Sequence, residues 1–299
     1  MTLYTQVSKN IRKTWLLITV FLVFIVGLGW LFGNVYDQPL ILYFAVGFSF
    51  LTSFLSYWHS DKIVLALSHA KPIEKKDAPE LYRIVENLCI AGGLPLPKIY
   101  VINDPAPNAF ATGRDAKHAV VAVTSGLLEI LERSELEGVI AHELSHIGNR
   151  DMLVSTVVVI LVGTVAMMAD LFLRMSFWGM RSRDSRDRGQ LGAIMMVLGI
   201  VAVILAPIAA TLIQLAVSRK REFLADASGA LLTRYPEGLA SALRKISAYP
   251  QSVRHASDAT AHLYFASPFR SKEKKSWFHK LFLTHPPVEE RIKALQGLR

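Results

Sequence analysis

Residues 134–149 read SELEGVIAHELSHIGN, a stretch with two histidines four positions apart and a glutamate directly after the first. The S-x-x-E pattern of Ser134 and Glu137 is typical of a capping box and predicts a helix that begins at Ser134. Residues i and i+4 share one face of a helix, so His142 and His146 can bind one ion. H-E-x-x-H on a helix is a recognised zinc-site pattern. The alternative is a solvated helix that carries two surface histidines.

Glu143 lies beside the two histidines, where its carboxylate can act on a water molecule rather than bind the metal. The pattern therefore favours a zinc site with a metal-bound water within reach of Glu143.

A catalytic zinc ion takes three protein ligands, so a third ligand must come from another segment. The stretch SRKREFLADASGA, residues 218–230, places Glu222 and Asp226 four residues apart on one helix face. Glu222 follows one apolar segment and the HELSH helix precedes another, so a pair of apolar helices between them brings both motifs to one membrane surface. The alternative is that both acids are ordinary surface charges.

Four uncharged segments contribute much of the 52% hydrophobic content of the 299 residues: residues 14–36, 38–60, 152–169 and 189–218. Each comes close to or exceeds the ~20 residues that cross a bilayer core, so we expect about four transmembrane helices. The first segment is longer than a signal-peptide core and lacks a clear cleavage site. We therefore expect an uncleaved hairpin of the first two segments.

The distribution of basic residues predicts the orientation of this hairpin. Lysine and arginine flank it on both sides, whereas the link between its helices carries only Asp37. The positive-inside rule then places residues 61–151 in the cytoplasm. The loop at residues 174–188 conflicts with this rule, because it holds five arginines and two aspartates. The third and fourth segments are thus either transmembrane or a re-entrant hairpin, and both arrangements leave the metal site cytoplasmic.

The rest of the chain indicates an α+β fold that is predominantly helical. Short β-type runs at 98–102 and 119–124 stand among helical patterns at 78–91, 125–131, from 219 with a break near Pro236, and after Thr284. The turn formers between the two β-type runs predict a loop there. The run at 119–124 is either an edge strand, which an extended substrate can join, or part of the sheet core.

These segments suggest four regions in the chain. They are an N-terminal transmembrane hairpin (1–60), a first half of the catalytic domain (61–151), a second hydrophobic hairpin (152–218) and a second half of the catalytic domain (219–299). The net charge of +9 fits contact with anionic headgroups, and no nucleic-acid motif is present. The single cysteine, Cys89, excludes an internal disulfide and fits a reducing compartment.

Several stretches together resemble the M48 family of membrane zinc metallopeptidases: AHELSHIGNRDM, SRKREFLADASGALL, THPPVEERI, NAFATG and SGLLEIL. The resemblance covers nearly the whole chain and implies an integral membrane zincin of the gluzincin-like type, with one Zn²⁺ per chain. The implied zinc ligands are His142, His146 and Glu222. Glu143 would be the general base, and Asp226 would accept a hydrogen bond from a ligand histidine. His285 or Asn108 would donate a hydrogen bond to the oxyanion as a catalytic residue, and Asn108 would also lie near the substrate strand.

The resemblance also implies a biological role. It is that of an endopeptidase that cleaves misfolded or damaged membrane proteins at the cytoplasmic face of a bacterial inner membrane. The implied partners are those substrates and the lipid bilayer. One alternative is a non-catalytic metal-binding scaffold or chaperone, which would not need Glu143. A second is a metal transporter, whose ligands should lie near the bilayer midplane. A metzincin is excluded, because IGNRDML supplies no third histidine.

Overall fold

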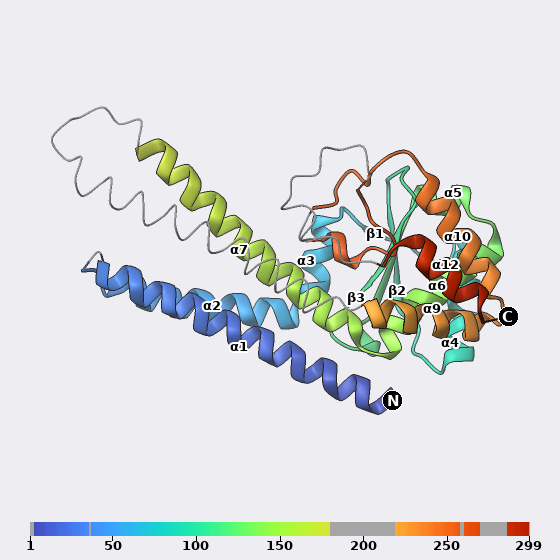
Figure 1. Ribbon diagram of the computed structural model, residues 1–299, viewed down its shortest axis with the longest axis horizontal. Coiled ribbons are helices and arrows are strands. Elements are labelled where there is room, and N and C mark those ends of the chain that lie inside the picture. Colours follow the sequence, from blue (N-terminus) through green and yellow to red (C-terminus); the bar gives the residue numbers. More distant parts are fainter. Residues whose placement is uncertain (1–2, 36, 180–218, 258–259, 270–285, 299) are drawn as a thin grey trace.

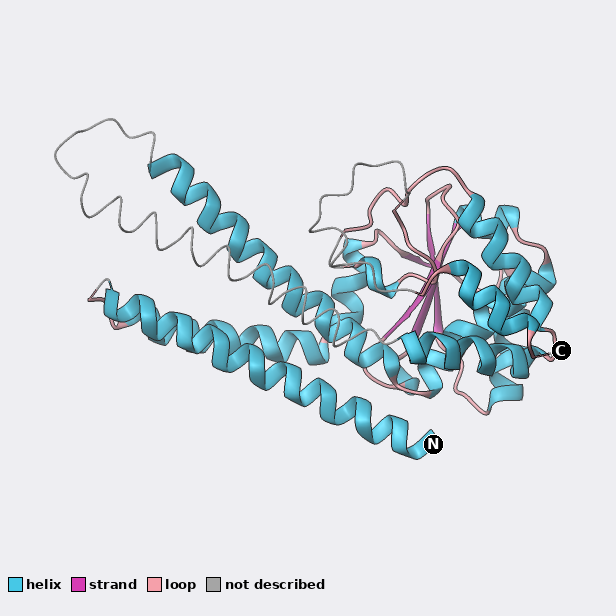
Figure 2. Cartoon of the chain, in the orientation of Figure 1, coloured by secondary structure: helices cyan, strands magenta, loops and turns pink. Residues whose placement is uncertain are grey.

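The computed structural model describes residues 3–35, 37–179, 219–257, 260–269 and 286–298. A small sheet with helices packed around it forms one end of the molecule, and long helices extend away from it (Figure 1). Helix covers most of the described residues (Figure 2), as predicted.

The long helices are α1 (Leu3–Val35), α2 (Leu40–Trp58) and α7 (Asp151–Gly179). Each contains a segment long and apolar enough to cross a membrane by length and composition. They correspond to the first three predicted segments. The fourth, residues 189–218, lies outside the described residues, so the total number of spans stays a prediction.

Helix α2 carries its large apolar side chains on the outside. Phe44, Phe50 and Phe54 are exposed, whereas the buried face consists of small residues, among them Ser49 and Ser56. Helices packed in lipid typically turn small residues toward neighbouring helices and large apolar residues outward.

The sheet has the strand order β1-β2-β4-β3. Its strands are β1 (Lys71–Pro72), β2 (Lys98–Ile102), β3 (Ala109–Thr112) and β4 (Val120–Thr124). β4 runs parallel to β2 and antiparallel to β3. Of the two alternatives for residues 119–124, the structure supports the sheet core, because β4 is paired on both sides. The edge strands are β1 and β3, and β3 comes from a stretch predicted to be a loop. Its four residues are all buried, so they show no alternation that would indicate a strand.

The predicted helices are confirmed, with small shifts in their ends. They are α4 (Pro79–Gly92), α5 (Ser125–Ile130), α9 (Arg219–Thr233), α10 (Pro236–Ala248) and α12 (Val288–Gln296), and a further short helix is α3 (Ser60–Leu67).

Helix α6 (Arg133–Gly148) carries the H-E-x-x-H stretch, and its N-cap is Glu132 rather than the predicted Ser134. The Glu132 N–H donates to Glu135 Oε2 at 2.8 Å. Glu135 also binds Lys245 of α10, with an Nζ–Oε2 distance of 2.7 Å. Glu137, the partner expected of Ser134, instead pairs with Arg133. The E-x-x-E pattern of Glu132 and Glu135 overlaps the S-x-x-E pattern of Ser134 and Glu137. The contact between Glu135 and Lys245 favours the first pair, and the local sequence does not reveal this tertiary contact.

Helix α9 packs closely against α6 because a glycine stands at their contact. A Cβ atom at Gly229 would lie 3.0 Å from the His142 backbone nitrogen. Glu222 lies about two turns before Gly229 on the same helix. The close approach at Gly229 therefore brings the α9 carboxylates up to the histidines of α6.

Candidate metal centre

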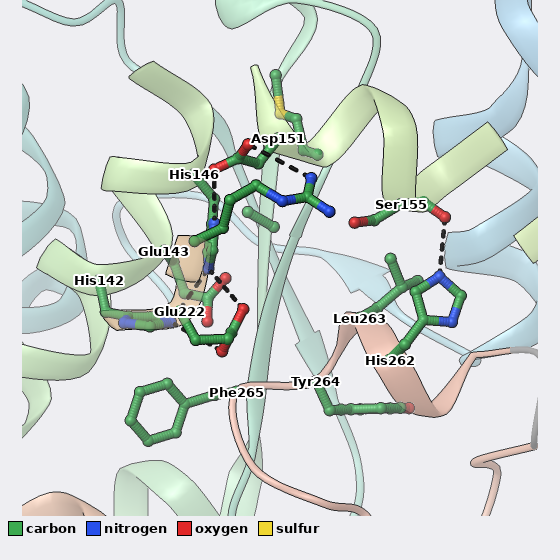
Figure 3. A pocket seen from close by; sticks show the side chains of 13 residues that line it. His142, Glu143, His146, Asp151, Ser155, Glu222, His262, Leu263, Tyr264 and Phe265 are labelled. Carbon is green, nitrogen blue, oxygen red and sulfur yellow. Dashed lines mark hydrogen bonds and ion pairs between the residues drawn. The ribbon is translucent and has the colours of Figure 1, made fainter. Parts of the chain in front are cut away.

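Helices α6 and α9 bring three potential metal ligands together (Figure 3). The Nε2 atoms of His142 and His146 are 3.1 Å apart. Glu222 Oε1 lies 3.6 Å from His146 Nε2, and Glu222 Oε2 lies 4.0 Å from His142 Nε2. Two imidazole nitrogens and one carboxylate oxygen that converge in this way form a donor set that fits a divalent metal such as zinc.

Each histidine turns its other ring nitrogen toward a buried aspartate. His142 Nδ1 is 2.9 Å from Asp226 Oδ1, and His146 Nδ1 is 3.4 Å from Asp151 Oδ2. A carboxylate on Nδ1 fixes the ring orientation and leaves the Nε2 lone pair for a metal. Asp226 was among the residues singled out from the sequence, whereas Asp151 was not. Its only local signal is a charge at the start of an apolar helix.

Arg291 of α12 completes the surroundings of His142. Its side chain is fully buried, and it donates to Asp226 from Nε at 2.8 Å and from Nη2 at 2.7 Å. Its Nη1 donates to the Phe265 carbonyl at 2.8 Å. The guanidinium also lies over the Phe265 ring, 4.7 Å from its centroid. Arg291 therefore fixes both the carboxylate behind His142 and the loop opposite it.

The metal-ligand group lines a narrow cavity of about 30 Å³. Glu143 and Ala111 of β3 form part of its wall, and residues 262–265 form the opposite side. This loop segment follows the outer edge of β3, where the Phe265 N–H donates to the Ala109 carbonyl at 2.8 Å. The Phe265 ring stands edge-on to His142, with centroids 5.0 Å apart. The centre is thus enclosed between α6, the sheet edge and this loop.

A family model described as Peptidase family M48 matches residues 75–299. The chain belongs to this family. A protein named Protease HtpX homolog from Caldanaerobacter subterraneus subsp. tengcongensis is 45% identical over 300 residues, which cover 99% of this chain and 98% of that protein. Another of the same name from Tropheryma whipplei (strain Twist) is 46% identical over 299 residues, with the same coverage.

A crystal structure of S. mikatae Ste24p resembles this M48 peptidase in fold. The TM-score is 0.50 at 19% identity, and the match covers 95% of this chain and 67% of that one. With the family match and the apolar helices, the chain is a membrane metalloprotease, and the group His142, His146 and Glu222 fits the metal that the family requires.

Burial and neighbouring charges determine the protonation of this M48 site. Burial lowers the pKa of His142 to about 4, although Asp226 acts to raise it, so the ring is neutral and Nδ1 donates to Asp226. Burial also acts to lower the pKa of His146, but Asp151 and Glu222 raise it to about 9. Metal binding must therefore displace a proton from His146.

The pKa values of Glu143 and Asp226, two of the carboxyl groups of the centre, are shifted in opposite directions. Burial raises the pKa of Glu143 to about 7, close to the value that suits a general base at neutral pH. Burial also acts to raise the pKa of Asp226, but Arg291 and His142 lower it to about 2, so Asp226 is a carboxylate that accepts from both.

A residue of the first long helix reaches this M48 centre. The buried Asn10 of α1 donates from Nδ2 to Asp151 Oδ1 at 2.6 Å and to the Asn149 carbonyl at 3.0 Å. Arg221 Nη1 approaches the same Asp151 oxygen at 3.5 Å. Asp151 is thus held by an apolar helix far away in sequence while its other oxygen faces His146. Sequence reasoning missed Asn10, because no local pattern signals such a contact.

The structure does not bring all the residues singled out from the sequence to the cavity. Asn108 is buried, and its amide joins the backbone of β3 to the loop: Nδ2 donates to the Ala266 carbonyl at 2.9 Å, and Oδ1 accepts from the Ala266 N–H at 3.2 Å. It is not among the residues that line the cavity. A catalytic role for Asn108 stays a prediction, and its contacts favour positioning of the strand. His285 lies outside the described residues.

Replacing Asp151 by asparagine should weaken metal binding by about 10–100-fold, because an amide lacks the charge that holds His146 Nδ1–H. Competition of the purified chain with a chelator for zinc measures the effect. Asn10→Leu should also weaken zinc binding, but by a smaller factor. Asp77→Asn changes an exposed acid far from the centre and should leave the affinity unchanged. Equal zinc affinity in Asp151→Asn and the parent chain would contradict this support of His146.

Proposed function

We propose that this M48 peptidase is a zinc-dependent endopeptidase that cleaves misfolded or damaged membrane proteins at the cytoplasmic face of the bacterial inner membrane, in protein quality control. One observation carries the proposal. Glu143 and the group His142, His146 and Glu222 line one cavity at the edge of a sheet, in a chain with long apolar helices.

We assign His142, His146 and Glu222 as the zinc ligands. Two histidines and a glutamate match the ligand set of catalytic zinc, which keeps a further position for water or substrate. When bound, the ion supplies Lewis acidity, because it polarises a carbonyl oxygen and makes a water molecule more acidic. The support of His142 by Asp226 and of His146 by Asp151 fixes the two rings for this task.

Glu143 is assigned as the general base. It follows a ligand histidine on α6 and is buried in the wall of the cavity. Its carboxylate accepts the proton of the attacking water and passes it to the amine that leaves. The oxyanion that forms between these steps needs a hydrogen-bond donor, and the assignment of His285 to this role remains a prediction.

We propose that an extended substrate binds along the outer edge of β3 and not along residues 119–124. Residues two apart in an antiparallel strand direct their backbone groups to the same side. Ala109 uses its carbonyl for the Phe265 N–H, and Ala111, two residues further, lines the cavity. An extended substrate that pairs at Ala111 places a peptide bond beside Glu143. Main-chain pairing gives weak sequence selectivity, which suits a protease of unfolded segments.

Removal of the metal should abolish cleavage. The chain purified in detergent with zinc should degrade unfolded casein, and it should cut a destabilised membrane protein faster than the same protein when folded. A chelator should stop both reactions, and zinc should restore them. Cleavage that persists in chelator, or folded and destabilised substrates cut at equal rates, would contradict the proposal.

The proposed topology places residues 61–151 and 219–299, the two halves of the catalytic domain, in the cytoplasm. Cys89 is buried, so the natural chain gives a low background for thiol labelling. Asp37→Cys, in the link between α1 and α2, should react with a membrane-impermeant maleimide on intact spheroplasts. Lys98→Cys, at the exposed start of β2, should react only after lysis. The reverse pattern would place the metal centre outside the cytoplasm.

A further inference from the structure

A second cavity, of about 390 Å³, lies where the long helices meet the sheet region. One wall comes from α1 and α2 and includes Trp15 and Tyr57. The opposite wall comes from the loop after β3, with Arg114 and Lys117, and from Arg150 at the junction of α6 and α7. None of the residues that line it lines the metal centre. No residue assigned to metal binding or catalysis lines this cavity.

Aromatic side chains near this cavity indicate its depth relative to the membrane. Trp15 and Tyr57 stack with ring centroids 5.7 Å apart, and Trp15 is nevertheless 54% exposed. Trp58, the last residue of α2, lies under the Arg114 guanidinium at 4.9 Å. Tryptophan and tyrosine concentrate where a membrane protein passes from hydrocarbon to headgroups. Their position at the end of α2 and in the early turns of α1 puts the cavity at the headgroup level.

The polar wall of the cavity is positively charged. It holds the basic residues Arg114, Lys117 and Arg150 and one acidic residue, Asp115. Asp115 pairs with Arg114, whose Nε lies 3.5 Å from Asp115 Oδ2, and with His118, whose Nδ1 lies 2.8 Å from Asp115 Oδ1. Three basic side chains against this one carboxylate leave a net positive wall, which favours an anionic ligand. Arginine is well suited to phosphate, because its planar fork donates two parallel hydrogen bonds.

The wall from α1 and α2 is largely apolar. Ile11 lies there with the two aromatic rings, and Leu153 of α7 adds a further apolar lining residue. A free phosphate or an acidic peptide gains nothing from such a wall, whereas a molecule with a charged head and a hydrocarbon chain matches both sides. We therefore propose that this cavity binds an anionic phospholipid. Its phosphate is held by Arg114, Lys117 and Arg150, and an acyl chain lies against Ile11, Trp15 and Leu153.

Arg150 connects this cavity to the metal centre. It stands between the end of α6 and Asp151 at the start of α7, and its backbone has the left-handed φ of +54°, which is uncommon outside glycine. A phosphate on its side chain fixes the turn that presents Asp151 to His146. The proposal itself does not depend on proteolysis, and binding can be measured in an inactive chain.

The test uses the full chain in a neutral detergent and measures binding of short-chain phosphatidylglycerol and phosphatidylcholine by native mass spectrometry. Phosphatidylglycerol should bind tighter by roughly tenfold. The triple variant Arg114→Gln, Lys117→Gln, Arg150→Gln should lose this preference. A control with the same charge change at Lys76, Lys98 and Lys293 should keep it. Because Lys117 is exposed, Lys117→Glu alone should weaken phosphatidylglycerol binding without a change in thermal unfolding.

Three results would overturn the proposal. They are equal binding of the two lipids, a preference that survives in the triple variant, and a preference that the control loses as well. A further arm adds glycerol phosphate, which has the charge but no acyl chain. It should compete poorly with phosphatidylglycerol, and competition at equal concentration would assign the site to a free phosphate compound instead.

Discussion

Replacement of Glu143 by glutamine should reduce the rate of peptide cleavage by about two to four orders of magnitude and leave the bound metal in place. Glutamine keeps the size of the side chain and its hydrogen-bonding reach, but it cannot accept the proton of the attacking water. The ligands His142, His146 and Glu222 are untouched, so the zinc content should stay the same. Cleavage of casein and metal content, measured on the same preparation, check both parts.

The matched control for this variant is Glu137→Gln on the same helix. Glu137 is a partly exposed residue whose carboxylate pairs with Arg133 at the surface. Its activity should equal that of the parent chain. Equal cleavage by the Glu143 variant would reveal a contaminating protease. Loss of zinc in that variant would mean that Glu143 holds the metal instead of acting as a base. If the parent chain binds zinc but cleaves nothing, the alternative of a non-catalytic metal-binding scaffold would be favoured.

Replacement of Arg291 by methionine should lower the free energy of unfolding by about 3–5 kcal/mol, because it removes one partner of a buried ion pair. Asp226 is 1% exposed and would keep a charge without its two guanidinium hydrogen bonds. The loop at Phe265 would lose a donor to its carbonyl. Chemical unfolding in mixed micelles, followed by fluorescence, measures the effect. Affinity for zinc should fall as well, because Asp226 orients His142.

Arg244→Met provides the comparison for a surface arginine. Arg244 pairs with Glu237 on α10, with side chains 43% and 29% exposed, and its replacement should cost at most ~1 kcal/mol. Arg291→Lys should fall between the parent chain and Arg291→Met, because lysine keeps the charge but lacks the planar fork. A cost for Arg291→Met no larger than that for Arg244→Met would show that the buried pair does not stabilise this fold.

The double variant Arg291→Met, Asp226→Leu separates the two roles of the pair. Replacement of both members of a buried ion pair by apolar residues is often nearly neutral for stability. The double variant should therefore recover much of the stability lost in Arg291→Met. It should not recover zinc affinity, because His142 then has no carboxylate on Nδ1. Recovery of both properties would show that the pair acts only on folding.

The parts of the centre that the sequence predicts are those with a local signal. His142 and His146 share a face because of helical periodicity, and Glu222 and Asp226 do so for the same reason. The apolar segments stand out by length alone. Four residues of β3 are too few and too uniformly buried to show a period, so this edge strand was not predicted and the position of residues 119–124 in the sheet stayed open.

The contacts that support the ligands could not be predicted in this way. Asn10 meets Asp151 across 141 positions, and Arg291 meets Asp226 across 65. Each is an ordinary polar residue in its own segment, and only the packing of α1 against α7 and of α12 against α9 gives it a partner. A single sequence carries no signal for such pairs.

The order in which the ligands occur along the chain has a consequence for synthesis. His142 and His146 leave the ribosome well before Glu222, and Arg291, which fixes Asp226 behind His142, follows later still. A growing chain therefore has an incomplete ligand set until Glu222 is made, and Asp226 lacks its guanidinium partner until α12 is made. The metal centre of a nascent chain should stay incomplete until α9 has packed against α6.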